Sequence, residues 1–517
     1  MTAESSILIA IILPLFAVPM LVMSSSRPNQ RERITLVTAA VTFFVIGSLF
    51  DDVASGARPT LTLGELLPSL SITFTLEPLG MLFAGIASSL WIVTTIYAIG
   101  YMRGHHEQNQ TRFFVCFAIA ISSAIGIAFS GNLLTFFIFY EVLTLSTFPL
   151  VTHSGTESAK RAGRVYLGIL IGTSIVFLLT AIVWTYNVTN TLDFTEGGIF
   201  GENVSVGVMA TLLPLYIFGI GKAAVMPFHR WLPAAMVAPT PVSALLHAVA
   251  VVKAGVFGVL KVTIYIFGID NLVALGSSAW IQYLAAATIL VASLVALSRD
   301  NLKARLAYST VSQLSYIVLA SLLGSALGTL GGAMHIAMHA FGKITLFFCA
   351  GAIMVASHKT EISQMRGLGR KMPITFFCFL IGSLSIIGLP PFGGVWSKWY
   401  LLLGAADINE VIFILILMIS SLLNVAYLIP IVIRGFYNEN LEIDQEYPSK
   451  THYTENRRLL DPGDAVANNV WRVRGFHEAP ATCIGALSFT ALGCVVLFFY
   501  ADTLFRFLHP IVSGGAP

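Results

Sequence analysis

Two stretches decide the fold: GIGKAAVMPFHRWLP at residues 219–233 and GLPPFGGVWSKWY at residues 388–400. Each combines prolines and glycines with a lysine inside a long apolar run. Proline removes a backbone donor and clashes with the preceding turn, so a helix is expected to break at both places. Lys222 and Lys398 are therefore predicted to lie beside helix breaks at membrane depth.

Outward from these breaks, apolar runs continue to both ends of the chain. The 517 residues are 56% hydrophobic and 11% charged, whereas about a quarter of the residues of a soluble domain are charged. We recognise about fourteen apolar segments, each about 20 residues long, which is the length that crosses a bilayer. Backbone polar groups must be satisfied inside lipid, and runs this long predict helices. We expect an all-α polytopic membrane protein that contacts the lipid bilayer, and no nucleic-acid partner.

The two breaks also suggest internal repetition. Breaks at corresponding positions of two halves are typical of inverted repeats in transporters. His247 and Lys253 in LLHAVAVVKAGVFG have counterparts in His339 and Lys343 of MHAFGKITLFF. We predict three N-terminal transmembrane helices (residues 1–112), a first five-helix repeat with helices 4–8 (113–268), a second with helices 9–13 (269–433), a cytoplasmic loop (434–480), and a last helix with the C-terminus (481–517).

The basic residues between the segments predict the orientation. If the first loop is cytoplasmic and sides alternate, 22 of the 29 lysines and arginines fall on the cytoplasmic side, and only Arg58 and Arg506 fall on the opposite side. This asymmetry follows the positive-inside rule. Both termini are therefore predicted outside.

Five lysines and one acid remain within apolar segments. A charged side chain at the bilayer centre costs about 3 kcal/mol or more, so such residues are functional candidates by default. We expect Glu141 to pair with Lys222, Glu77 to have a cap-like role, and Lys261 to reach the interface by snorkelling. The lysines are Lys222, Lys253, Lys261, Lys343 and Lys398.

Histidines accompany the buried lysines. His335, His339 and Lys343 are spaced i, i+4, i+8 and should form one stripe, which suits a proton relay because histidine titrates near neutrality. HIAMH lacks the glutamate of the HExxH zinc motif, so no metal site is expected. His247 and Lys253 are six residues, or about 600°, apart and should face different sides of a helix.

The end of this set is Lys398, where Ser397 is expected to orient the lysine at a proton exit or ion gate. No GxGxxG motif and no cysteine cluster is present, because the five cysteines lie in apolar segments without a CxxC pair. We therefore expect no redox cofactor in this chain.

Several motifs together resemble one membrane-protein family. They are FYEVLTLSTFPL (139–150), GKAAVMPFHRWLPAAMVAPTPVSALLHAVAVVKAG (221–255), SRDNLKARLAYSTVSQLSY (298–316), HAFGKITLFF (339–348) and GLPPFGGVWSK (388–398). The chain resembles the antiporter-like subunits shared by Mrp-type multisubunit cation/proton antiporters and respiratory complex I. The resemblance implies fourteen helices with two inverted five-helix repeats.

The resemblance also implies roles for the candidate residues. Glu141 and Lys222 correspond to an ion pair, Lys253 with His247 to a central lysine site, and Lys398 to a terminal lysine. His335, His339 and Lys343 correspond to the connecting relay. Some complex I members carry glutamate at the last position and the largest carry a long lateral helix, so Lys398 and the lack of that helix favour a D-type Mrp subunit.

The implied function is proton translocation along this set, in a transporter subunit rather than an enzyme. The full complex, with other membrane subunits in a bacterial inner membrane, would exchange internal Na⁺ or another monovalent cation for external protons. Three alternatives remain. They are a proton-pumping subunit of a complex I-like or membrane-hydrogenase oxidoreductase, an energy-coupling subunit for inorganic-carbon uptake, and a scaffold in which buried charges only hold helices together.

Overall fold

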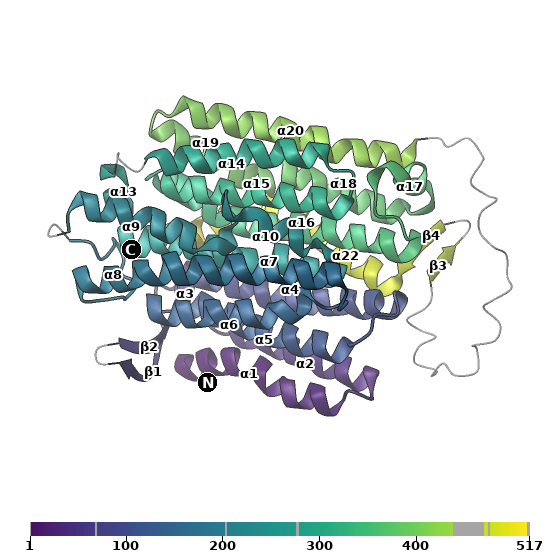
Figure 1. Cartoon of the computed structure of the whole chain (residues 1–517), viewed down its shortest axis with the longest axis horizontal. Helices are drawn as coiled ribbons and strands as arrows, with labels where there is room; N and C mark the ends of the chain where they lie inside the picture. Colours follow the sequence, from purple (N-terminus) through teal and green to yellow (C-terminus); the bar gives the residue numbers. More distant parts are fainter. Residues whose placement is uncertain are drawn as a thin grey trace.

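The protein is a bundle of long helices that run along a common direction (Figure 1). The computed structural model describes residues 2–67, 70–201, 204–275, 279–437, 470–473 and 476–513. Within these ranges, 11 helical segments are long and apolar enough to cross a membrane. They are α1 (Ala3–Met23), α2 with α3 (Pro28–Gly47, Phe50–Ala54), α4 (Pro78–Gly104), α5 (Gln110–Phe129), α6 (Leu133–Val151), α7 with α8 (Glu157–Thr173, Thr180–Thr189), α11 with α12 (Thr240–Ala244, Val251–Val262), α14 (Ala279–Ser298), α16 (Ala326–Ser357), α20 (Val411–Phe436) and α22 (Ala481–Phe499).

Three more segments complete the fourteen that the sequence predicts. One is α15 (Leu302–Leu322), which is long but rich in serine and threonine. The other two are the broken segments. One runs from α9 (Val206–Gly219) to α10 (Trp231–Ala234), and the other from α18 (Pro373–Ile387) to α19 (Gly394–Asp407). The prediction of an all-α polytopic membrane protein is confirmed.

Both predicted helix breaks are present. After α9 the chain passes through a short 3-10 turn, Gly221–Ala223, and Ala224 takes a left-handed backbone conformation with φ of 56°. After α18, Gly388 has φ of 90°, a region that glycine enters without the steric cost of a Cβ atom. The breaks leave backbone groups of both segments free for other contacts: the Lys222 N–H donates to the Tyr140 hydroxyl on α6, and the Ile387 carbonyl accepts from the Lys398 ammonium.

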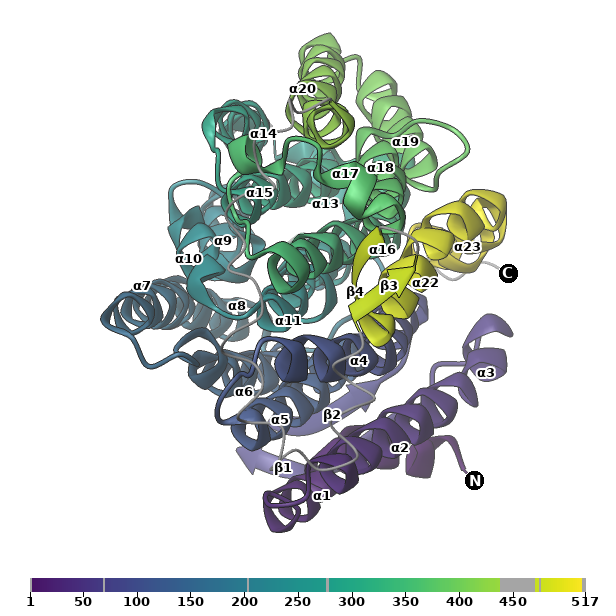
Figure 2. The same cartoon turned by 90° about the vertical axis from the view of Figure 1, so that its right-hand side faces the viewer.

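The view along the helices shows α16 near the middle of the bundle (Figure 2). The N-terminal helices α1, α2, α4 and α5 lie on one side of it, and α14, α15, α18 and α20 lie on the other. Short elements fill the ends: α13 (Ile269–Ala274), α17 (Leu368–Lys371) and α23 (Ala501–Leu508). The boundaries of the two predicted repeats stay predictions, whereas the central place of α16 positions its side chains between the two halves.

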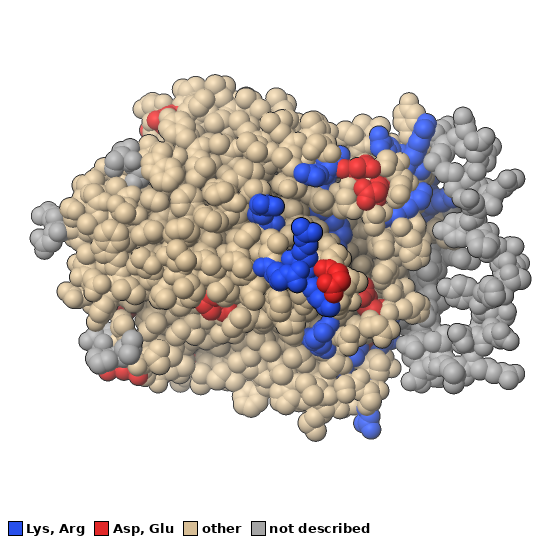
Figure 3. Space-filling model, in the orientation of Figure 1, with Lys and Arg blue, Asp and Glu red and all other residues tan. Residues whose placement is uncertain are grey.

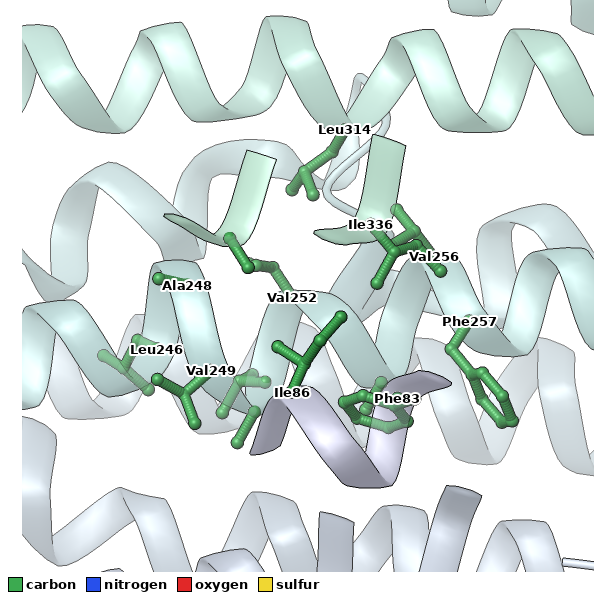
Figure 4. Packing of buried hydrophobic residues seen from close by; sticks show 14 of the residues in the cluster. Phe83, Ile86, Leu246, Ala248, Val249, Val252, Val256, Phe257, Leu314 and Ile336 are labelled. Atoms are coloured by element: carbon green, nitrogen blue, oxygen red, sulfur yellow. The ribbon is translucent and has the colours of Figure 1, made fainter. Parts of the chain in front are cut away.

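The core around α12 is built by apolar side chains of neighbouring helices, among them α4, α15 and α16 (Figure 4). Phe83 and Ile86 from α4 lie close to Val252 and Val256 of α12. The rings of Phe83 and Phe257 are 5.1 Å apart between centroids. Lipid is as apolar as these side chains, so close packing, rather than removal from water, holds such helices together.

Two short antiparallel hairpins, which the apolar pattern of the sequence did not predict, lie outside the helices. They are β1 (Thr60–Leu67) with β2 (Leu70–Thr75), and β3 (Val470–Val473) with β4 (Phe476–Pro480). Most of the predicted 434–480 loop lies outside the described residues. Its last part is anchored, because Glu478 accepts hydrogen bonds from Ile374 N (2.7 Å) and Thr375 Oγ1 (2.6 Å) at the start of α18.

The charged residues of the described surface are distributed unevenly. On the face shown in Figure 3, lysines and arginines gather toward one end of the helices, and the opposite end carries a few acids and no visible lysine or arginine. Such an asymmetry is what the positive-inside rule leads one to expect of a multi-pass membrane protein. The cytoplasmic assignment of the basic end, and of the termini opposite to it, stays a prediction.

Candidate functional site: a buried line of lysines and histidines

Lys222 lies at the first helix break and contacts α6. Its ammonium donates to the Tyr140 carbonyl (2.8 Å) and to Thr144 Oγ1 (2.6 Å), and it lies 3.0 Å from the centroid of the Tyr140 ring. The Tyr140 hydroxyl accepts a hydrogen bond from the Lys222 backbone N–H at 3.1 Å. The side chain of Lys222 is fully buried. The break and the lysine are thus fixed together on one face of α6.

The predicted direct pair between Glu141 and Lys222 is wrong in its geometry. Both carboxylate oxygens of Glu141 are buried without a hydrogen-bond partner among the described residues. Glu141 is one residue after Tyr140, which turns it by about 100° around α6, while Lys222 is satisfied by the face that Tyr140 and Thr144 share. The carboxylate still lies within electrostatic range of the ammonium. The two groups are neighbours, and no contact ion pair joins them.

Lys253 connects the two halves of the bundle. On α12, its Nζ lies 2.7 Å from Nδ1 of His339 on α16, and both side chains are fully buried. Gly255, two residues later, is where α12 approaches the broken segment, since a Cβ atom there would overlap the backbone of Lys222 and Ala223. The absence of a side chain at Gly255 therefore lets the first break pack directly beside the Lys253 site.

His247 does not lie on a different side from Lys253, as a regular helix would require. Its ring is 4.6 Å from the ring of Phe347, so both His247 and Lys253 face α16. The helix is irregular between them: Leu245–Val249 is a π-helical turn, and Ala250 departs from helical geometry with φ of −120°. These changes of phase bring the two residues to one face. Neither ring nitrogen of His247 has a hydrogen-bond partner among the described residues.

The line continues along α16 to the second break. His339 and His335 lie one turn apart, with ring centroids separated by 5.8 Å. His335 Nε2 is 3.2 Å from Gln313 Oε1 on α15, and its Nδ1 is 2.8 Å from Ser397 Oγ on α19. The expected role of Ser397 is thus modified, because its hydroxyl contacts the histidine, while the lysine beside it binds other groups.

Lys398 ends the line at the second break. Its ammonium donates to the Ile387 carbonyl at 3.0 Å and to Ser421 Oγ at 3.1 Å. It lies 5.0 Å from the centroid of the Tyr316 ring, which in turn stacks with His335. As at the first break, a carbonyl, a hydroxyl and an aromatic ring surround the lysine. The two breaks therefore hold their lysines in chemically similar sites.

Lys343 is on the same helix as the histidines but contacts different groups. Its ammonium donates to Ser309 Oγ of α15 at 2.5 Å, and that hydroxyl also accepts from Tyr427 of α20 at 2.8 Å. The predicted stripe of His335, His339 and Lys343 is present on α16 and is entirely buried. Lys343 forms a branch from it, since the contacts between Lys253 and Lys398 pass through the two histidines.

Lys261 does not snorkel to an interface as expected. It is 1% exposed and forms an ion pair with Glu77 at the start of α4, so the cap-like role expected for Glu77 is also replaced. The rings of Phe194, Phe257 and Tyr265 surround the ammonium, with the Phe194 centroid at 4.6 Å. Position near the end of a segment suggested an interface, but neighbouring segments cover this end of α12.

Several polar partners of these residues were not singled out from the sequence. Gln313 and Ser309 lie within SRDNLKARLAYSTVSQLSY, and polar residues in a membrane helix were the signal that was available. Taken together, the fold and the site define a class of protein: a multi-pass membrane protein whose interior carries a line of ionisable side chains from one half of the bundle to the other.

Comparison with known proteins identifies the family. Residues 130–424 match the transmembrane family described as NADH:quinone oxidoreductase/Mrp antiporter. The chain is 30% identical over 450 residues to NADH-quinone oxidoreductase subunit N of Desulforudis audaxviator, covering 84% of this chain and 86% of that protein. The chain therefore belongs to this family of proton-translocating membrane subunits.

One further relative and two solved structures show additional similarity. A protein of Rhizobium meliloti, described as part of a probable K⁺/H⁺ antiporter, is 32% identical over 367 residues, covering 70% of this chain and 36% of that protein. An Mrp complex from Dietzia sp. DQ12-45-1b contains a chain with a TM-score of 0.84 at 21% identity, covering 99% of this chain and 97% of that chain. A chain of an archaeal membrane-bound sulfane sulfur reductase has a TM-score of 0.82, also at 21% identity, covering 98% and 97%. At this identity, the two structural likenesses concern the fold.

Proposed function

We propose that this chain is the proton-translocating subunit of an Mrp-type multisubunit antiporter that exchanges Na⁺, or another monovalent cation, for protons. The observation that carries the proposal is the contact between Lys253 and His339. From His339 the line continues to His335 and then to Ser397, which precedes Lys398 in the sequence. The proposed setting is a bacterial inner membrane, with both termini outside and with other membrane subunits of the same complex as partners.

The proposed route uses groups that hold and release protons. In the proposed route the Lys253 ammonium donates to Nδ1 of a neutral His339, and the 2.7 Å separation lets the proton pass from lysine to imidazole without a change in heavy-atom positions. His339 Nε2 has no hydrogen-bond partner among the described residues. Both ring nitrogens of His335 already have partners, so a water that links the two rings would have to replace Gln313 or Ser397 at His335 while the proton passes.

The Ser397 hydroxyl then leads from His335 to the second break. Since the Lys398 ammonium binds Ile387 and Ser421 and not Ser397, a water would have to carry the proton over this last step to a neutral Lys398.

Glu141 and Lys222 supply the control of this route. Lys222 is held by Tyr140 and Thr144, and the Glu141 carboxylate beside it is buried without a hydrogen-bond partner within the described chain. A buried charge without a partner is energetically unfavourable, so ionisation of Glu141 would favour movement of the Lys222 ammonium toward the carboxylate. Since Gly255 brings the Lys222 backbone against α12, this movement would change the electric field at Lys253.

A second candidate function is a proton-pumping subunit of a complex I-like respiratory complex. The specific observation in its favour is the relative from Desulforudis audaxviator, a subunit N of NADH-quinone oxidoreductase that matches 84% of this chain. The two functions share the same buried line and differ in what drives it. The first couples the line to the movement of a monovalent cation, and the second couples it to a redox reaction in partner subunits.

The test is proton flux in inverted membrane vesicles that contain the assembled complex. Addition of Na⁺ or K⁺ should collapse a preformed pH gradient when the wild-type chain is present. Glu141→Ala, Lys222→Ala and Lys398→Ala should each lower that flux at least tenfold, while Val142→Ala, on the exposed side of the same helix, should leave it unchanged. Normal flux in all three variants would contradict the relay. Proton flux that occurs only after addition of NADH or another reductant would favour the second candidate.

A further inference from the structure

Gln313 of α15 contacts His335 in the buried line, yet only half of its amide group is used. Its Oε1 lies 3.2 Å from His335 Nε2, while the amide nitrogen of Gln313 has no hydrogen-bond partner among the described residues. Both side chains are buried, so neither finds another partner at the protein surface. A buried polar group that stays unpaired in a native structure calls for an explanation. A single hydrogen bond to His335 is what holds this amide in its orientation.

In this orientation the amide determines which nitrogen of His335 carries the proton. The oxygen of Gln313 can only accept, so Nε2 of a neutral His335 carries the proton and Nδ1 carries the lone pair. That lone pair accepts from the Ser397 hydroxyl at 2.8 Å. Gln313 therefore holds His335 as the Nε2–H tautomer.

A half-turn of the same amide would hold the other tautomer. The terminal torsion of glutamine is roughly two-fold, and a turn of about 180° exchanges the amide oxygen and nitrogen. The Gln313 nitrogen would then donate to His335 Nε2, and His335 Nδ1–H would donate to Ser397 Oγ. The Ser397 hydroxyl has an acceptor for this state, because the Gly394 carbonyl lies 3.2 Å from its oxygen. The half-turn therefore loses no hydrogen bond.

The proposed line needs both tautomers of His335. A proton that comes from His339 through water adds at His335 Nε2 once the amide has turned aside, and the proton on Nδ1 passes to the Ser397 oxygen, whose own proton moves on toward Lys398. This transfer converts the Nδ1–H tautomer into the Nε2–H tautomer. Before the next transfer, water has to carry the proton from Nε2 to Nδ1 of the same ring. Transport is therefore fastest when neither tautomer is strongly favoured.

We propose that Gln313 is a positioning residue that binds either tautomer of His335 and so keeps both available for proton transfer. The role rests on the proposed function, because it belongs to the same buried line. Glutamine suits it because one amide presents a donor and an acceptor on the same short stem. A residue that can only accept would hold one tautomer and stop the line at this ring.

Two substitutions of Gln313 separate this role from packing. In Gln313→Glu the carboxylate keeps the shape of the amide but can only accept, and the ammonium groups within electrostatic range of His335, those of Lys398, Lys253 and Lys343, favour its ionised form. Cation-driven proton flux per folded complex should fall at least tenfold. Gln313→Ala leaves room for a water, which can donate or accept and so serves both tautomers. Its flux should stay within about fivefold of the wild type, since one neutral hydrogen bond contributes about 1 kcal/mol.

The tautomers themselves should be observed by solid-state NMR of the assembled complex with isotope-labelled histidine. The signals of His335 are assigned by their loss in His335→Leu. We expect both tautomers in the wild type and in Gln313→Ala, and a protonated Nε2 in every molecule of Gln313→Glu. The matched control is Gln282→Glu, at a half-buried glutamine of α14 that donates to the Leu322 carbonyl at 2.7 Å, and it should behave as the wild type in flux and in NMR.

A role in packing alone would give the opposite order of activities, because Gln313→Glu keeps the shape and the hydrogen bond that Gln313→Ala loses. Lower flux in Gln313→Ala than in Gln313→Glu, or the same single tautomer of His335 in all of these proteins, would overturn the proposal. The tautomer measurement does not require transport. Absence of cation-driven flux in the wild type would therefore contradict the proposed function, while the NMR signals would still decide the role of Gln313.

Discussion

The Nζ atom of Lys253 lies 2.7 Å from Nδ1 of His339, and this contact joins helices that are 86 residues apart in the sequence. The lysine belongs to the first predicted repeat and the histidine to the second. Both are buried completely, so neither has water as an alternative partner at the protein surface. A proton that passes along the proposed line between the two breaks has to cross at this contact.

Replacement of His339 by leucine should therefore interrupt transport between the two halves. The leucine keeps the apolar volume of the site but provides no acceptor for Lys253, and we expect cation-driven proton flux to fall at least tenfold. His477→Leu, at an exposed histidine on β4, is the control and should retain wild-type flux. Flux should be measured in vesicles with equal amounts of assembled complex. Equal activity of the two variants would show that protons take another route.

Loss of the next contact, between His335 and Ser397, should reduce proton flux less than loss of His339, but by a measurable amount. Ser397→Ala removes one of the two partners of His335, and a hydrogen bond of this kind contributes about 1 kcal/mol. We expect a reduction of flux of about two- to tenfold, and recovery in Ser397→Thr, which restores the hydroxyl group. If the role of Ser397 were only structural, Ser397→Ala would lower the amount of folded complex but leave the flux per folded complex unchanged.

The helical fold and most of the buried line could be predicted from the sequence because both depend on residue types that lipid penalises. Runs of about 20 apolar residues must form helices. Lysines inside such runs must be buried and bound to protein groups, as Lys222 and Lys398 are. The prolines and glycines next to these two lysines correctly indicated the breaks, because their effect on the backbone is local.

The predictions were wrong where a contact depends on the direction in which a residue faces around its helix, or on a segment far away in the sequence. His247 faces α16 because a π-helical turn shifts the register of its helix, and no residue pattern in LLHAVAV announced that turn. Glu141 and Lys222 are close, but the exact face of α6 that meets the break decided which oxygens the ammonium binds. Lys261 and Glu77 are separated by 184 residues, so their pairing was not visible in either local sequence.

The Lys261–Glu77 pair should be structural, and a double-mutant cycle can show it. Removing one member of a buried pair leaves the other charge unpaired, which typically costs about 3–5 kcal/mol. Lys261→Met and Glu77→Gln should each lower the thermal midpoint of the purified complex. The double variant should lose clearly less stability than the sum of the two single variants.

Transport provides the control for this interpretation. Flux per folded complex should be unchanged in all three proteins, because Lys261 and Glu77 make no contact with the proposed line in the described structure. A loss of flux in excess of the loss of folded complex would instead place the pair on a proton route.

Stability should also depend on pH through His105, which follows α4 at the predicted cytoplasmic end. Its Nδ1 is 3.1 Å from Glu107 Oε1, and this hydrogen bond to the carboxylate raises the pKa of His105 above its ordinary value of 6.5. The raised pKa means that the protonated histidine stabilises the folded state. The stabilisation is complete below pH 6.5 and is lost as the pH rises through the raised pKa.

Glu107→Gln should remove this dependence. Burial lowers the pKa of the neighbouring His153, so its titration lies below that of His105 and does not replace the titration that is lost. Because His105 is partly exposed, we expect the difference between wild type and variant to be at most about 1 kcal/mol. The wild type should have the higher thermal midpoint at pH 6, and the two midpoints should converge by about pH 9, well above the pKa of His105. Midpoints that differ by a constant amount from pH 6 to about pH 9 would show that the pair does not titrate in this range.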